Sequence, residues 1–206
     1  MNTHFLALLL FLSLNAASFS KTSFRHQVLP LHKKSYAPIL SDQDVKIFWL
    51  ENDTFHINES YLKTITRQQR AALGYITTFV GNDCDWDGDK KTDESNLKCK
   101  LLSALDLGYQ CSEKHLSFLR EWFKGDQKVL EDLQTCKRTP ASANIQDSFI
   151  ELRMLTVDNT ITITYSAVGF DFNAKHTWNW TEESIFTFTK NEIKRTGRKN
   201  IEGGFN

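Results

Sequence analysis

The residues with the clearest potential for chemistry lie in an acidic twelve-residue segment, 83–94. Carboxylates recur there at alternate positions, a glycine follows, and a glutamate stands at the last position. Calcium binds about six to eight oxygen ligands, and alternate carboxylates around a sharp turn at Gly88 can surround one ion. The Asp89 carbonyl and both carboxylate oxygens of Glu94 would complete the set. The candidate ligands are Asp83, Asp85, Asp87, Asp89 and Glu94.

This segment fits the pattern D-x-[DN]-x-[DN]-G-x5-E at every specified position, and it therefore resembles an EF-hand calcium loop. Two residues depart from the family: Lys90 stands where an apolar residue is usual, and Lys91 where an oxygen ligand or water is usual. With one such loop in the chain, the resemblance implies a structural or weak calcium site. The alternative is a solvated acidic turn without an ion. Six carboxylates beside two lysines repel one another unless a cation or solvent screens them.

Four cysteines in the middle third of the chain predict two disulfides. Three pairings are possible, and we favour Cys84–Cys99 with Cys111–Cys136. Two consecutive helices packed antiparallel would bring Cys111 and Cys136 to the same end. A zinc site is disfavoured, because the chain has no Cys-x-x-Cys pair and no histidine at ligand spacing.

The sequence contains no nucleophile elbow, HExxH motif or glycine-rich phosphate loop. His115 could act as a general base, although a histidine near an apolar helix stripe is more simply structural. Glu182 and Glu183 could form a carboxylate pair or, more simply, a turn between strands. Trp178 and Trp180 share one strand face, as core residues or as an exposed recognition platform.

Apolar residues at helical spacing predict four helices within residues 58–136. The first opens on a capping box formed by Thr66 and Gln69 and stops at Gly81. The second covers about 95–107, and the third and fourth begin after the N-cap candidates Ser112 and Asp126.

The period changes from helical to alternating over residues 146–193. The clearest strand is Thr160 to Tyr165, and further strand patterns occur at 149–157, 176–181 and 185–189. An earlier pair at 45–50 and 54–57 reads as a hairpin. We therefore expect an α+β fold: a disulfide-stapled helical bundle followed by a three- or four-stranded antiparallel β-meander, which would pack on the helices.

The N-terminus predicts export. Phe5 to Leu14 is an apolar run of ten residues, too short for a bilayer span of about 20 residues. Residues 1–18 are therefore expected to be a signal peptide, cleaved near Ser18 or Ser20, leaving a secreted or periplasmic chain without a transmembrane segment. The expected remainder is a mobile basic arm (19–44), one α+β domain (45–193) and a polar tail (194–206).

The charge balance excludes some function classes. The 206 residues include 25 Lys+Arg and 25 Asp+Glu, which disfavours a nucleic-acid binder. The charges are unevenly distributed, because residues 83–94 carry a local charge of −4 and residues 190–200 a local charge of +4. Small size, crosslinking and the lack of a catalytic motif favour an exported non-catalytic protein-binding module of inhibitor or immunity type. The alternative is a small secreted hydrolase with a structural calcium site.

Overall fold

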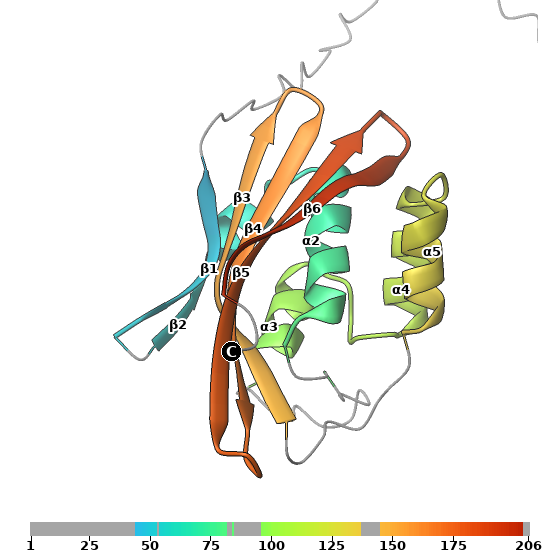
Figure 1. The fold of residues 1–206 in the computed structure, drawn as a ribbon. Helices are drawn as coiled ribbons and strands as arrows, with labels where there is room; N and C mark the ends of the chain where they lie inside the picture. Colours follow the sequence, from blue (N-terminus) through green and yellow to red (C-terminus); the bar gives the residue numbers. More distant parts are fainter. Residues whose placement is uncertain (1–43, 53, 82–83, 85–95, 137–144, 204–206) are drawn as a thin grey trace, which may run out of the picture. The chain divides into compact units, whose positions relative to one another are not determined.

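One antiparallel sheet of six strands organises the protein, in the order β2-β1-β3-β4-β5-β6 (Figure 1). This computed structural model describes residues 44–52, 54–81, 84, 96–136 and 145–203. The strands are β1 (Val45–Glu51), β2 (Thr54–Ile57), β3 (Ile145–Val157), β4 (Thr160–Asp171), β5 (His176–Phe188) and β6 (Ile193–Gly203). Strand β1 pairs with β3, which lies more than a hundred residues further along the chain, through Val45–Met154 and Trp49–Glu151.

Helices cover one face of this sheet, with α2 nearest to the strands and α4 and α5 beyond it (Figure 1). The helices are α1 (Glu59–Leu62), α2 (Arg67–Phe79), α3 (Leu97–Ala104), α4 (Glu113–Trp122) and α5 (Gln127–Gln134). Gly74 lets α2 approach its neighbours closely, since an added Cβ would lie 2.5 Å from Leu107 Cδ1.

The predicted helix starts are confirmed. Thr66 caps α2, and its side chain and that of Gln69 exchange both bonds of the capping box. Ser112 and Asp126 cap α4 and α5 by accepting backbone N–H bonds from His115 and Val129. These bonds satisfy amides that have no partner inside the helix, which is why short polar residues mark the helix starts.

The core lies between the helices and the inner face of the sheet. Alternate residues of β4, including Ile161, Ile163 and Tyr165, are buried on that face. They pack beside Phe186 of β5 and beneath α2. The period-two pattern of the sequence thus corresponds to one covered and one open sheet face.

The α+β class is confirmed, but three details differ from expectation. The sheet has six strands rather than three or four, and the described helices form a layer against it rather than a separate bundle. The expected strands at 176–181 and 185–189 are parts of one strand, β5, which ends at Phe188, so Glu182 and Glu183 do not form a turn. Residues of the expected polar tail form β6 as far as Gly203.

Several expectations fall outside the described residues: the signal peptide, the basic arm up to residue 43, and the acidic segment apart from Cys84. Within the part of the chain that is described, no helix has both the length and the apolar character that a bilayer span requires.

Candidate functional site

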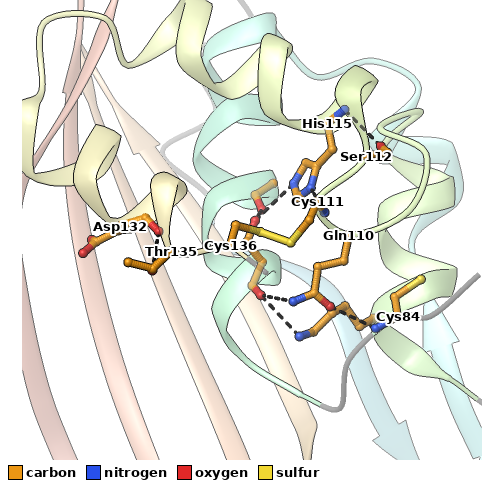
Figure 2. Close-up of a disulfide and its surroundings, with 11 residues drawn as sticks. Cys84, Gln110, Cys111, Ser112, His115, Asp132, Thr135 and Cys136 are labelled. Atoms are coloured by element: carbon orange, nitrogen blue, oxygen red, sulfur yellow. Dashed lines mark hydrogen bonds between the residues drawn. A yellow bond between two sulfur atoms is a disulfide. The ribbon is translucent and has the colours of Figure 1, made fainter. Parts of the chain in front are cut away.

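Two disulfides join the predicted cysteine pairs. Cys84 is bonded to Cys99, with their Cα atoms 5.2 Å apart, and Cys111 to Cys136, with Cα atoms 5.7 Å apart. The second links the start of α4 to the end of α5, as the antiparallel arrangement predicted (Figure 2). Two disulfides in a chain of this size indicate an oxidising extracellular or periplasmic environment.

His115 lies beside this second disulfide and is fully buried (Figure 2). Its Nδ1 accepts the backbone N–H of Cys111 at 3.1 Å, and its Nε2 lies 3.1 Å from Thr78 Oγ1. Because Nδ1 accepts, this network assigns the proton of the neutral ring to Nε2. Burial lowers the pKa of His115 to about 4, and the nearby ammonium of Lys98 acts in the same direction. His115 is therefore a neutral structural group at physiological pH.

The end of α2 connects both disulfides. The Thr78 carbonyl accepts from Lys98 Nζ at 3.3 Å and from Gln110 Nε2 at 3.1 Å. Gln110 Oε1 in turn accepts the Cys84 N–H at 2.9 Å (Figure 2). A cation at the C-terminal end of a helix is favourably placed against the helix dipole. This buried polar network links the end of α2 to α3 and to the segments that carry both disulfides, and His115 lies fully buried beside it.

A second polar cluster occupies the inner face of β4, β5 and β6. Arg198 donates two hydrogen bonds to the buried carboxylate of Glu182, from Nε to Oε1 at 2.7 Å and from NH2 to Oε2 at 2.8 Å. The Glu182 carboxylate raises the pKa of Arg198. Burial, together with the Glu182 carboxylate, raises the pKa of Tyr165 to about 12. The cluster therefore consists of a protonated tyrosine, a carboxylate and the arginine that pairs with this carboxylate.

A third cluster joins β6 to the helices and was not predicted. Tyr75 donates to Asp132 Oδ2 at 2.6 Å, and Arg195 NH2 donates to the same oxygen at 3.1 Å. Arg195 NH1 also bonds the Tyr75 hydroxyl, and the guanidinium lies 5.0 Å from the centre of the Tyr75 ring. Sequence spacing gives no sign of this contact, because its members lie on three separate elements.

The three residues considered for hydrolysis are not brought together. Glu182 faces the helices and is paired with Arg198, whereas its neighbour Glu183 points to the opposite face of β5. His115 is bonded to Thr78 and Cys111 between the helices. The described residues thus supply no carboxylate pair and no His–carboxylate pair from this set.

The two strand tryptophans differ in their surroundings. Trp180 packs against the edge of the core. Trp178 lies across Gly169 of the adjacent strand, where an added Cβ would be only 2.2 Å from its ring. Neither is a fully buried core residue.

The end of the β4–β5 hairpin extends beyond the helices (Figure 1). We call its aromatic side chains the aromatic hairpin: Phe170, Phe172, His176 and Trp178. Phe170 and Phe172 make an edge contact with ring centres 4.6 Å apart, and His176 stacks on Trp178 at 6.2 Å. The Phe172 side chain is 48% exposed.

A local turn orders the tip of this hairpin. Asp171 Oδ1 accepts the backbone N–H groups of Asn173 at 2.8 Å and Ala174 at 3.0 Å. Strand pairing continues to Asp171–His176, the last pair before the turn. The aromatic side chains are thus carried on a paired, hydrogen-bonded element.

The candidate calcium ligands, Asp83, Asp85, Asp87, Asp89 and Glu94, all lie outside the described residues. The flanking elements are described: α2 ends at Phe79, and α3 begins at Leu97 after the N-cap Asn96. Elsewhere in the described chain, no three His, Cys, Asp or Glu side chains are grouped closely enough to hold a metal ion.

Comparison with known proteins returned no match to any family model, curated protein or solved structure.

Proposed function

We propose that the chain is an exported, non-catalytic protein-binding module of inhibitor or immunity type, and that the aromatic hairpin is its contact element. The observation that carries this proposal is the ordered set of aromatic side chains beyond the helical layer. Aromatic residues dominate the energy of protein interfaces. A contact element that is already ordered loses less conformational entropy on binding than a flexible loop does.

Export is part of this proposal. The apolar run Phe5 to Leu14 supports a cleaved signal peptide, and the two disulfides support an oxidising destination. The form of the hairpin favours an inhibitor-like role, because a projecting two-stranded element can enter the cleft of a partner protein.

We also propose that the acidic segment 83–94 binds a structural calcium ion. Its support is the D-x-[DN]-x-[DN]-G-x5-E pattern, a helix before it and a helix after it. The Cys84–Cys99 bond adds a covalent tether at the second position of the pattern. Tethering lowers the entropy that the chain loses when it wraps an ion.

Affinity capture from the native host's envelope fraction tests the binding function. The oxidised wild-type chain should retain one reproducible protein, and Phe172→Ala should lose it. Phe55→Ala is the matched control, since Phe55 is a similarly exposed aromatic (39%) on another hairpin. Equal capture by all three chains would refute the aromatic hairpin as the contact element.

A further inference from the structure

We propose that the Cys111–Cys136 disulfide is a reversible redox switch: a dithiol reductant opens it in the folded protein, and its opening loosens the attachment of α5 to β6. This inference goes beyond the proposed binding function and depends neither on the aromatic hairpin nor on the acidic segment. Three features support it: the exposure of the two cysteines, the backbone conformation of Cys111, and the contacts that join α5 to β6.

The two disulfides differ in exposure. Cys111 and Cys136 are both half-buried, so each residue of this pair has surface in contact with solvent. In the other disulfide, Cys84 is only 2% exposed, and its backbone N–H is bonded to the buried side chain of Gln110. A thiolate must reach a disulfide sulfur to attack it, and exposed disulfides are the more easily reduced ones. We therefore expect the Cys111–Cys136 bond to react first.

The backbone of Cys111 also favours opening. Its φ angle is +59°, in the left-handed region, and Cys111 is the one cysteine of the four with a positive φ. This conformation is unfavourable for a residue with a Cβ atom and persists where the surrounding contacts hold it. The disulfide and the hydrogen bond from the Cys111 N–H to His115 Nδ1 both restrain this residue. Reduction removes the first restraint and lets the backbone relax.

Helix α5 is joined to β6 through a single arginine. At the start of the helix, Asp126 Oδ2 accepts the backbone N–H of Arg195 at 2.7 Å. In its last turn, Asp132 Oδ2 accepts from Arg195 NH2 at 3.1 Å and from the Tyr75 hydroxyl at 2.6 Å. The two ends of α5 thus hold the beginning of β6 at two separate points.

The disulfide secures the second of these points. Cys136 follows Asp132 by about one helical turn. Helix α5 has eight residues, fewer than the roughly 12–15 that a helix needs to be stable alone. With the disulfide closed, its last turn is tied to the start of α4. With the disulfide open, fraying of this turn moves Asp132 away from Arg195, so the redox state is transmitted to β6.

The reaction is an ordinary thiol–disulfide exchange. A thiolate of the dithiol attacks one sulfur, which gives a mixed disulfide and releases the other cysteine as a thiolate that takes up a proton. The second thiol of the reductant then displaces the remaining cysteine. Two electrons and two protons pass to the two cysteines, and the dithiol is oxidised to a disulfide. An added disulfide oxidant reverses the reaction and closes the switch.

Graded reduction of the full oxidised chain tests the proposal. Dithiothreitol is added at neutral pH without denaturant, free thiols are trapped with iodoacetamide, and peptide masses identify the opened bond. We expect Cys111–Cys136 to open at least about tenfold faster than Cys84–Cys99. Hydrogen exchange on the same samples should show lost protection at 130–134 and 194–198, while α2 and β4 stay protected. Oxidised glutathione should restore the original protection after the dithiothreitol is removed.

Variants test the connection from the disulfide to β6. Asp132→Asn should increase exchange at 194–198 in the oxidised chain, and reduction should then add little further loss there. Glu131→Gln changes an exposed carboxylate of the same helix and should behave like the wild type. Cys111→Ser with Cys136→Ser should match the reduced wild type. If this double variant does not fold, reduction of the wild type still carries the test.

Three outcomes would overturn the switch. The first is opening of Cys84–Cys99 before Cys111–Cys136 or at the same rate. The second is unchanged exchange at 194–198 after Cys111–Cys136 has opened. The third is a loss of protection in all elements at once on reduction, which would identify this disulfide as a purely structural crosslink.

Discussion

Arg198 and Glu182 form a two-bond ion pair between neighbouring strands, with the carboxylate buried and the Arg198 side chain 64% exposed. The arginine thus covers a carboxylate that would otherwise face the core uncompensated. Because a buried charge without a partner is costly, this pair explains how a glutamate is accommodated on the inner face of β5.

Replacing Arg198 with methionine should destabilise the protein by about 1–3 kcal/mol. This is less than for a fully buried pair, because solvent reaches the arginine. The double variant Arg198→Met with Glu182→Gln should recover part of the lost stability, since it removes the buried carboxylate that has no partner. Urea unfolding at neutral pH measures the free energy of unfolding of the single and the double variant. Lys199→Met is the control, and an equal loss there would contradict the role of the pair.

His115 should make stability depend on pH. Its pKa is about 4 in the folded protein and about 6.5 in an unfolded chain. The unfolded state therefore binds more protons between these values, so this contribution is complete above pH 6.5 and is lost as pH falls toward 4. The loss is at most about 3 kcal/mol.

The variant His115→Asn isolates the pH-dependent contribution of His115 to stability. It keeps an acceptor for the Cys111 N–H but removes the titrating ring. We expect it to be less stable than wild type at pH 7 and to show a flatter stability curve between pH 6.5 and 4, measured by urea unfolding at each pH. Parallel curves for the two proteins would mean that His115 does not cause the acid sensitivity.

Gly169→Ala should displace Trp178, because an added Cβ would lie 2.2 Å from its ring. Overpacking of this kind costs roughly 1–3 kcal/mol. The substitution should also change the fluorescence emission of Trp178. That emission is identified as the part of the wild-type spectrum that is missing in Trp178→Phe. Gly197→Ala is the comparison, since its added Cβ would lie 3.3 Å from the nearest atom. If both alanine variants keep the wild-type spectrum, Trp178 does not depend on Gly169.

Calcium removal tests the acidic segment. If 83–94 binds the ion, EDTA should lower the melting temperature, and added calcium should restore it, because a ligand bound to the native state stabilises it. Asp85→Asn with Asp87→Asn should abolish both the effect and the heat of calcium binding in calorimetry. Glu113→Gln with Glu121→Gln removes two exposed acids elsewhere and serves as the control. An EDTA-insensitive wild type with no calcium uptake would exclude the site.

Local signals in the sequence determined the helix starts. Thr66, Ser112 and Asp126 each cap a helix, because a cap depends on atoms within three residues of it. The pairing of Cys111 with Cys136 followed from consecutive helices, which are also close in sequence.

Only the tertiary structure decided the extent of the sheet. Segment 193–203 is rich in basic residues and lacks an apolar alternation, so nothing local marks it as a strand. It forms β6 because β5 offers a pairing edge, Glu182 and Asp132 receive its two arginines, and Asp126 bonds its backbone. Glu182 likewise lies within a strand because a distant residue, Arg198, pairs with its carboxylate. These contacts join residues far apart in the chain, and a sequence pattern read over short windows carries no information on such pairs.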